Sequence, residues 1–282
     1  MTVVAPTSRP HQSIGVRSVA GALGAEITGV DLAQPLDDDV FDEIQQAFYD
    51  HLVIFFRAQT IGPADQVAFT ERFGPTAPHP LGIASLDGHP QVMVLENRPG
   101  KLAARNDFWH SDISFGECPP ALSMLYAIEV TEGRADTMFT NMYAAYEGLS
   151  ERLRTILDGL DAMHDAEQLV NEVPSRVQAQ EVPPGVVHPV VRTHPGSGRK
   201  ALFVNPYYTA HFAGMTRQES QPLLQYLYQH ATQHENIYRH KWRVGDVLIW
   251  DNRCTMHYAV RDYDDSLPRF LHRTTAAGER PV

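Results

Sequence analysis

Residues 238–257 read YRHKWRVGDVLIWDNRCTMH, and this stretch decides the fold class. Its apolar and β-branched runs are short, and a Val-Gly-Asp segment and an Asp-Asn-Arg segment separate them. Short runs of β-forming residues divided by turn residues predict strands. We therefore expect strands at 238–242, 247–250 and 254–257, joined by tight turns.

The same pattern of short segments separated by turn residues extends through the upstream part of the chain. The 20 prolines and 19 glycines are scattered, which favours many short elements over a helical bundle. We expect strands at 52–56 and within 109–128, a hairpin at 190–204, and helices at 37–51, 63–74, 140–160 and 216–230. Strands dominate the middle and the end, so the pattern predicts a mainly β sandwich or barrel with helices packed outside it.

Composition excludes several classes of protein. The chain has 282 residues, with 23 Lys+Arg against 34 Asp+Glu, for a formal charge of −11. An acidic protein is poorly suited to nucleic acid, which requires a basic face. The two cysteines form no C-x-x-C pair, and no apolar run is long enough for a signal peptide or a membrane span. We expect a cytoplasmic protein with no nucleic-acid or membrane partner.

Three segments define the expected organisation. Residues 1–13 predict a disordered tail, and 14–282 predict a single domain. Residues 165–185 are polar, weakly periodic and end in Pro-Pro-Gly, which predicts a long loop. Loops of this length often act as lids over active sites.

The sequence Trp109-His110-Ser111-Asp112 is the most informative local motif. On a strand, residues i and i+2 share a face, so His110 and Asp112 could aim an imidazole nitrogen and a carboxylate oxygen at one point. With His257, they would complete a 2-His-1-carboxylate metal site. Two histidines and a carboxylate also suit catalytic zinc, so a zinc hydrolase stays open at this point.

Two arginines follow this motif near the C-terminus. Arg269 and Arg273 are four residues apart and would share one face of a strand. A guanidinium group takes a carboxylate or sulfonate through paired hydrogen bonds, so the two arginines predict anion capture.

Several motifs together resemble the taurine/α-ketoglutarate dioxygenase (TauD/TfdA) family, which includes taurine dioxygenase and the aryloxyalkanoate dioxygenases. They span almost the whole chain and occur at 24–32 (GAEITGVDL), 72–74 (RFG), 109–112 (WHSD), 188–195 (HPVVRTHP) and 250–257 (WDNRCTMH). The resemblance implies a double-stranded β-helix, or jelly roll (cupin-like), and a homo-oligomer, either dimer or tetramer.

The resemblance also implies cofactors and their ligands. His110, Asp112 and His257 would bind Fe(II), with α-ketoglutarate as cosubstrate and O2 as oxidant. Arg269 would hold the distal carboxylate of α-ketoglutarate, and Thr137 would share that task. The family usually has Gly-Gly before this Asp-Thr pair, where the present chain has Arg134-Ala135.

For the primary substrate, the resemblance implies contacts from Arg273, His79 and Asn106 to a small anionic headgroup. Gly82 stands where taurine dioxygenase has a larger aromatic residue, which indicates a roomier pocket. The expected function is hydroxylation of an alkylsulfonate such as taurine, or of an aryloxyalkanoate, with decarboxylation of α-ketoglutarate to succinate and CO2. The alternatives are the zinc hydrolase and a non-catalytic small-anion-binding module of the same fold.

Overall fold

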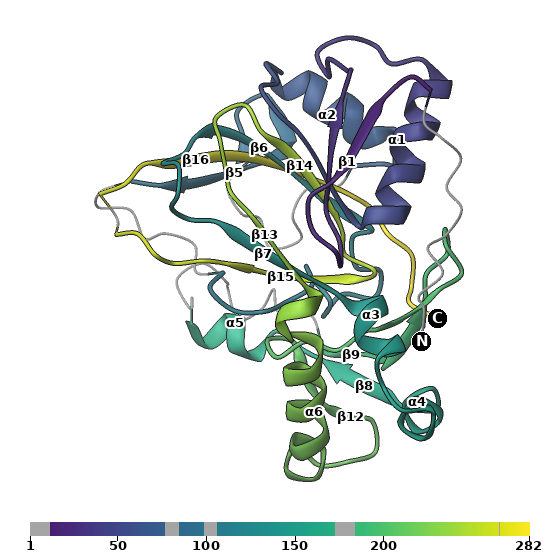
Figure 1. Ribbon diagram of the computed structural model, residues 1–282. Coiled ribbons are helices and arrows are strands. Elements are labelled where there is room, and N and C mark those ends of the chain that lie inside the picture. Colours follow the sequence, from purple (N-terminus) through teal and green to yellow (C-terminus); the bar gives the residue numbers. More distant parts are fainter. Residues whose placement is uncertain (1–11, 77–84, 99–105, 173–183, 265) are drawn as a thin grey trace.

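The computed structural model describes residues 12–76, 85–98, 106–172, 184–264 and 266–282 (Figure 1). Its largest element is an eight-stranded sheet with the order β1-β2-β3-β14-β6-β16-β5-β4. Neighbouring strands are antiparallel except β2 and β3, which are parallel. In chain order the strands are β1 (Gly15–Ser18), β2 (Ala25–Thr28), β3 (Val53–Phe56), β4 (Ser85–Leu86), β5 (His89–Asn97), β6 (Leu122–Glu129), β14 (Val247–Asp251) and β16 (Arg269–Ala276).

A three-stranded sheet lies across from the large one (Figure 1). It has the order β13-β7-β15 and consists of β7 (Thr137–Asn141), β13 (Ile237–His240) and β15 (Thr255–Ala259). Phe55, Leu248 and Trp250 of the large sheet share one core with Phe139 and Met256 of the small sheet. Two mostly antiparallel sheets packed face to face around a core form the predicted jelly roll.

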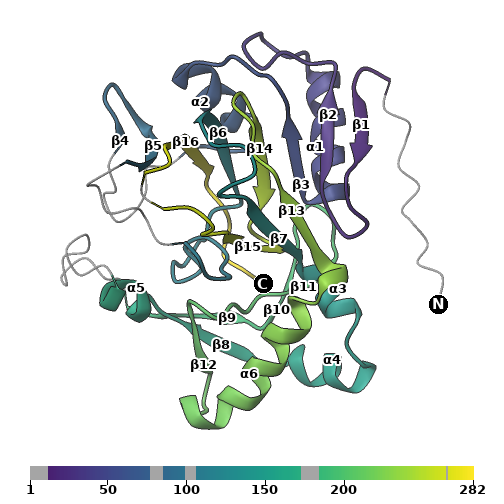
Figure 2. The ribbon, with the colours of Figure 1, turned by 60° about the vertical axis from the view of Figure 1, so that its left-hand side comes forward.

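The outer face of the large sheet is covered by two helices (Figure 2). α1 (Asp38–His51) buries Phe41, Ile44 and Phe48 at helical spacing against this face, and α2 (Pro63–Glu71) lies beside it. Because helices cover one face and the small sheet covers the other, β3 is buried on both sides. Its run Val-Ile-Phe-Phe is therefore continuously apolar instead of alternating.

The remaining elements lie beyond the small sheet (Figures 1 and 2). The helix expected at 216–230 is α6 (Arg217–Ala231), and it begins with a capping box in which Thr216 and Glu219 each bind the other's backbone amide. The elements are the sheet β12-β8-β9, of β8 (Asp161–His164), β9 (Val186–Pro189) and β12 (Thr209–Phe212); the hairpin β10 (Val191–Thr193) and β11 (Lys200–Leu202); and the helices α3 (Met142–Glu147), α4 (Glu151–Leu157), α5 (Glu167–Glu172), α6 (Arg217–Ala231) and the 3-10 helix His234–Asn236.

Two local predictions are wrong in part. The strand expected within 109–128 begins only at Leu122, because the chain turns just after Asp112, where Ile113 has a φ of 50°. The helix expected from Thr140 starts only at Met142. Residues up to Asn141 pair with β13 and β15, and the Asn141 side chain then caps α3.

The expected tail and lid fall largely outside the described residues. Residues 1–11 and 173–183 are among those not described, while the amides of Gln12 and Ser13 donate to Glu43. Within 165–185 the structure has a short helix, α5, where the sequence predicts a loop. The lid stays a prediction. No helix in the described ranges is both long and apolar enough to cross a membrane.

Candidate metal centre

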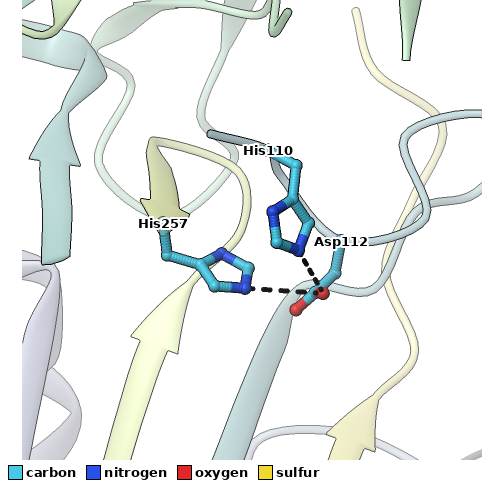
Figure 3. Close-up of side chains that lie close together, drawn as sticks. All are labelled: His110, Asp112 and His257. Atoms are coloured by element: carbon cyan, nitrogen blue, oxygen red, sulfur yellow. Dashed lines mark ion pairs between the residues drawn. The ribbon is translucent and has the colours of Figure 1, made fainter. Parts of the chain in front are cut away.

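Three buried side chains meet between the two sheets (Figure 3). The Nε2 atoms of His110 and His257 each lie 3.7 Å from Oδ1 of Asp112. One ligand atom from each residue falls within 4.8 Å of the other two. The structure thus brings together the three residues that the sequence proposes as metal ligands.

Main-chain hydrogen bonds place the two histidines side by side. His257 lies on β15, while His110 precedes a turn and pairs with His257 as an isolated antiparallel bridge. The Nδ1 atom of His110 is 2.9 Å from the carbonyl oxygen of Phe108. Because a carbonyl only accepts, this Nδ1 carries the proton and Nε2 has a free lone pair. The imidazole is therefore oriented for a ligand on the Asp112 side.

The two carboxylate oxygens of Asp112 have different surroundings. Ser123 Oγ donates to Oδ2 over 2.7 Å, and Arg273 Nη2 lies 2.6 Å from the same oxygen. Burial alone would raise the pKa of Asp112, but the positive charge of Arg273, the two imidazoles and the Ser123 hydrogen bond hold it well below its ordinary value. The carboxylate is therefore ionised at neutral pH.

The histidines are in the complementary protonation state. Burial lowers the pKa of His110, and burial together with the neighbouring His110 lowers that of His257 well below its ordinary value. Two neutral imidazoles and one ionised carboxylate are the state that binds a divalent cation. This donor set fits Fe(II) in a 2-His-1-carboxylate site.

Arg269 and Arg273 lie on β16 and, being four residues apart, face the same side of the large sheet as Leu271, which packs in the core between the sheets. The Nε atoms of both arginines are buried without a hydrogen-bond partner in the described part of the chain. Burial lowers the pKa of Arg269. Unsatisfied buried guanidinium donors are suited to an anionic ligand. Of the two, Arg273 contacts the candidate cation site, through Asp112.

The other predicted site residues have different outcomes. Thr137 is buried on β7, in the strand that carries Phe139 opposite His257, and its Oγ1 accepts a hydrogen bond of 3.0 Å from Trp242 Nε1. Asn106 is half-buried, and its carbonyl oxygen accepts from the amide of Ala259 over 2.9 Å. His79 and Gly82 lie outside the described residues. The roles of all three polar residues stay predictions.

Aromatic rings line one side of His110. Phe108 stacks on Tyr207 with 3.5 Å between ring centroids, and the rings of Tyr207 and Tyr208 lie 6.4 and 6.3 Å from the imidazole. Phe115 joins this group, which is a separate apolar cluster. The metal centre therefore has a charged side, at β16, and an aromatic side.

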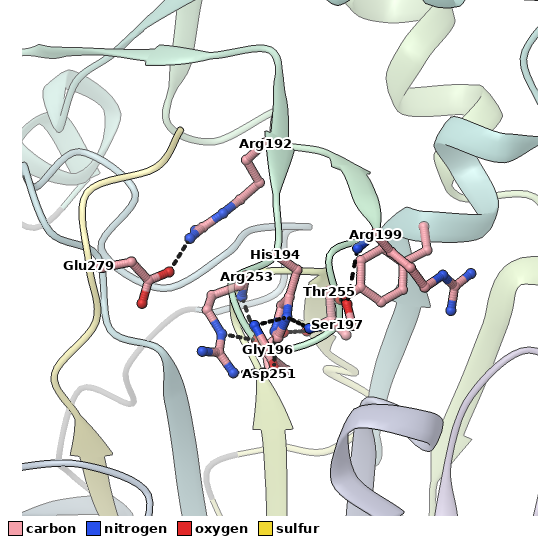
Figure 4. Close-up of polar contacts among 10 residues, drawn as sticks. Arg192, His194, Gly196, Ser197, Arg199, Asp251, Arg253, Thr255 and Glu279 are labelled. Atoms are coloured by element: carbon pink, nitrogen blue, oxygen red, sulfur yellow. Dashed lines mark hydrogen bonds and ion pairs between the residues drawn. The ribbon is translucent and has the colours of Figure 1, made fainter. Parts of the chain in front are cut away.

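A second group of potential ligands is His194, Asp251 and Cys254. Figure 4 shows the polar contacts of His194 and Asp251. Asp251 accepts from Arg253 Nε and Nη2 over 2.8 and 2.7 Å and from His194 Nε2 over 2.9 Å. His194 Nδ1 accepts from the amides of Gly196 and Ser197. Both imidazole nitrogens and both carboxylate oxygens are thus used within the protein, so this group holds a turn together and does not form a metal site.

Ser123 is the residue at the centre that the motifs do not single out. It is fully buried in β6, whose sequence Leu-Ser-Met-Leu-Tyr-Ala-Ile-Glu is otherwise apolar until its end. A hydroxyl in the first half of such a strand requires hydrogen-bond partners, and that requirement is the sequence signal that could have found it.

The chain is similar to known proteins over almost its whole length. The family described as "Taurine catabolism dioxygenase TauD, TfdA family" matches residues 15–275. An α-ketoglutarate-dependent sulfate ester dioxygenase of Pseudomonas putida is 38% identical over 294 aligned positions, covering 100% of this chain and 96% of the relative. An α-ketoglutarate-dependent 2,4-dichlorophenoxyacetate dioxygenase of Cupriavidus pinatubonensis is 36% identical, covering 92% and 96%. The crystal structure of a taurine dioxygenase from Burkholderia xenovorans superimposes with a TM-score of 0.82 at 36% identity, covering 96% of this chain and 93% of that one. The chain therefore belongs to the TauD/TfdA family of dioxygenases.

Proposed function

We propose that this chain is an Fe(II)- and α-ketoglutarate-dependent dioxygenase that hydroxylates a small organic anion. The observation that carries the proposal is the convergence of His110, Asp112 and His257, with Arg273 paired to Asp112. Arg273 and Arg269, on one strand, both have unsatisfied buried donors. Membership of the TauD/TfdA family supports the same reaction. The zinc hydrolase and the non-catalytic module receive no support from the relatives.

His110 and His257 would hold Fe(II) through Nε2, and Asp112 would hold it through Oδ1. When bound, Fe(II) with α-ketoglutarate and O2 supplies the oxidising power for the reaction. One oxygen atom enters succinate as CO2 is lost, and the other enters the substrate as a hydroxyl group. The residues of this chain bind the reactants, orient them and keep water away from the reacting carbon.

Arg269 and Thr137 are proposed to bind the distal carboxylate of α-ketoglutarate. The buried, unpaired Nε of Arg269 supplies a charged donor. The hydroxyl of Thr137 accepts from Trp242 Nε1, so its own proton stays available for a carboxylate oxygen. A buried arginine and a pre-oriented hydroxyl together distinguish a dicarboxylate from a monocarboxylate.

Arg273 is proposed to bind the anionic headgroup of the primary substrate, with His79 and Asn106 as further contacts. Its Nη2 is already engaged by Asp112 and Ser123, so the headgroup would use its remaining donors. The aromatic side at Phe108, Tyr207 and Tyr208 suits an alkyl or aryl portion. Relatives named for sulfate esters and for 2,4-dichlorophenoxyacetate make alkyl sulfates and aryloxyacids the first candidates, with taurine and other alkylsulfonates beside them.

Hydroxylation of the carbon next to the heteroatom would produce an unstable product. A hydroxylated alkyl sulfate would collapse to an aldehyde and sulfate, a sulfonate would release sulfite, and an aryloxyacid would release a phenol. The released ion or phenol therefore identifies the substrate class.

An anaerobic titration tests the proposal. Fe(II) and α-ketoglutarate are added to the purified protein, and the visible metal-to-ligand charge-transfer band is recorded. Hexyl sulfate, taurine and 2,4-dichlorophenoxyacetate are then titrated separately, and a shift of the band names the substrate class. A folded, iron-loaded protein that forms no band would contradict the proposal. Sedimentation analysis would test the expected homo-oligomer.

A further inference from the structure

We infer that Ser123 and Asn252 position the Asp112 carboxylate so that it binds the metal through Oδ1 alone. The inference deepens the proposed function and rests on it. Ser123 and Asn252 are positioning residues: they act through Asp112 and do not contact the metal or the substrate.

The Ser123 hydroxyl has all of its hydrogen-bonding capacity in use. Asn252 Nδ2 and Arg273 Nη2 each donate to its oxygen over 3.0 Å. A hydroxyl has two acceptor lone pairs and one proton. Both lone pairs are occupied by groups that can only donate, so the single proton must point to the third neighbour, Asp112 Oδ2, at 2.7 Å.

The orientation of Asn252 is also determined. Trp250 Nε1 lies 2.9 Å from Asn252 Oδ1, and the amide of Asp112 lies 3.4 Å from the same atom. Both neighbours are donors, so this end of the side chain is the carbonyl oxygen. The NH2 end then faces Ser123. The Trp250 indole thus sets the orientation of the Asn252 side chain, and Asn252 in turn leaves the Ser123 hydroxyl proton only Asp112 as its acceptor. We call this hydrogen-bonded series Trp250–Asn252–Ser123–Asp112 the relay.

The result is a carboxylate with two unequal oxygens. Oδ2 accepts a hydrogen bond from Ser123 and forms an ion pair with Arg273 Nη2, whereas no hydrogen bond within the described ranges reaches Oδ1, which faces the two imidazoles. An oxygen that already holds a hydrogen bond and an ion pair is a weaker metal ligand than a free one. Binding through one oxygen leaves open the coordination position that a second oxygen would occupy.

The relay is built on adjacent strands. Ser123 on β6 pairs directly with Trp250 on β14, and Arg273 projects from β16 on the other side of β6. Ser123 is fully buried, and Asn252 is 2% exposed. A carboxylate held by residues at the centre of a sheet is placed more exactly than one held by a loop alone. The relay therefore orients the Asp112 side chain although Asp112 itself lies in a turn.

The test compares Ser123→Ala with a matched control, Ser220→Ala. Both serines are fully buried. Ser220, on α6, accepts from the Phe212 amide over 3.0 Å and donates to the Thr216 carbonyl over 2.9 Å, so the control removes an equally buried, bonded hydroxyl away from Asp112. Co(II) affinity is measured without α-ketoglutarate by competition with a chromophoric chelator. We expect about tenfold weaker binding for Ser123→Ala, and a Ser220→Ala affinity equal to that of wild type.

The outcomes separate the inference from the proposed function. If the wild type binds no divalent cation, both the proposed function and the inference are contradicted. If wild type and Ser123→Ala bind Co(II) equally tightly, only the inference about the relay is contradicted. A crystal structure of the Co(II)-loaded wild type is a second test, which shows directly which Asp112 oxygen binds the metal and does not depend on the folding of any variant. Coordination through Oδ1, with Oδ2 still bonded to Ser123, is expected, and coordination through Oδ2 or both oxygens overturns the inference.

Discussion

The backbones of His110 and His257 hydrogen-bond to each other twice: the His110 amide donates to His257 over 3.1 Å, and the His257 amide donates back over 2.8 Å. The position of each imidazole therefore depends on the main chain and not on the other ring. His257 Nδ1, moreover, is buried without a partner among the described residues, so replacing the ring breaks no hydrogen bond of that atom.

We expect His257→Gln to fold without metal, with a Tm within a few degrees of wild type. The rise in Tm that saturating Mn(II) gives to the wild type should disappear, because a ligand stabilises only the protein that binds it. Thermal unfolding with and without Mn(II) measures both effects. A variant that keeps the full metal-induced rise would show that His257 is not a ligand.

Ala135 has a φ of 54°, in the left-handed region that favours glycine, directly before Asp136 and Thr137. We expect Ala135→Gly to raise the free energy of unfolding by up to about 1 kcal/mol by relieving this strain. The same change at Ala68, exposed within α2, should lower it by about 0.5–1 kcal/mol. Urea unfolding of both variants measures the opposite signs, and a shift in the same direction would contradict the strain assignment.

Arg269 and Thr137 should affect the cosubstrate selectively. Arg269→Gln removes a charged donor, so we expect the KM for α-ketoglutarate to rise about 10- to 100-fold. Thr137→Val keeps the shape and removes one neutral hydroxyl, so about a tenfold rise is expected. The KM for the primary substrate should change by less than either. Steady-state kinetics with each reactant varied in turn would separate these effects, and equal rises for both reactants would count against the assignment.

The Asp251–Arg253 pair is buried, so its loss should be costly. Asp251→Asn would leave the Arg253 guanidinium without a charged partner, and we expect a loss of about 3–5 kcal/mol in the free energy of unfolding. Glu167→Gln, which breaks an exposed ion pair with Arg217, should cost less than about 1 kcal/mol. Similar losses for the two variants in urea unfolding would refute this contrast.

His164 should make the protein less stable in mild acid. Burial, with a smaller effect of the neighbouring His188, lowers the pKa of His164 to about 3. The unfolded state, with a histidine pKa of about 6.5, takes up a proton that the folded state does not, so stability is complete above that pH and is lost as the pH falls toward 3. At pH 5 the contribution is about 2 kcal/mol. The stability difference between pH 7.5 and pH 5 should be smaller by this amount in His164→Gln than in wild type, and an equal difference in the two proteins would disprove it.

Sequence patterns predicted the parts of this fold that depend on local chemistry. The helix α1, the helix α6 and the short strands after residue 237 all follow from periodicity and turn residues. The motif at His110 shows the limit of such reasoning. Its side chains were predicted to meet because they share a strand face, whereas they meet because the chain turns at Ile113 and pairs with β15. A β-branched residue gives no signal of a left-handed turn, and a pairing across 147 positions (257 − 110) has no local pattern.

The two sheets contribute different parts of the candidate site: His257 and Thr137 come from the small sheet, and Ser123, Arg269 and Arg273 from the large one. Iron and α-ketoglutarate together would therefore act as a cross-link between the two halves of the sandwich. Their binding should slow amide hydrogen exchange in β15 and β16 alike, although the two strands share no hydrogen-bond ladder. Iron and α-ketoglutarate would in this way also stabilise the packing of the two sheets. Any separation of the sheets would move the ligand residues apart and so abolish the oxidising centre before the fold itself is lost.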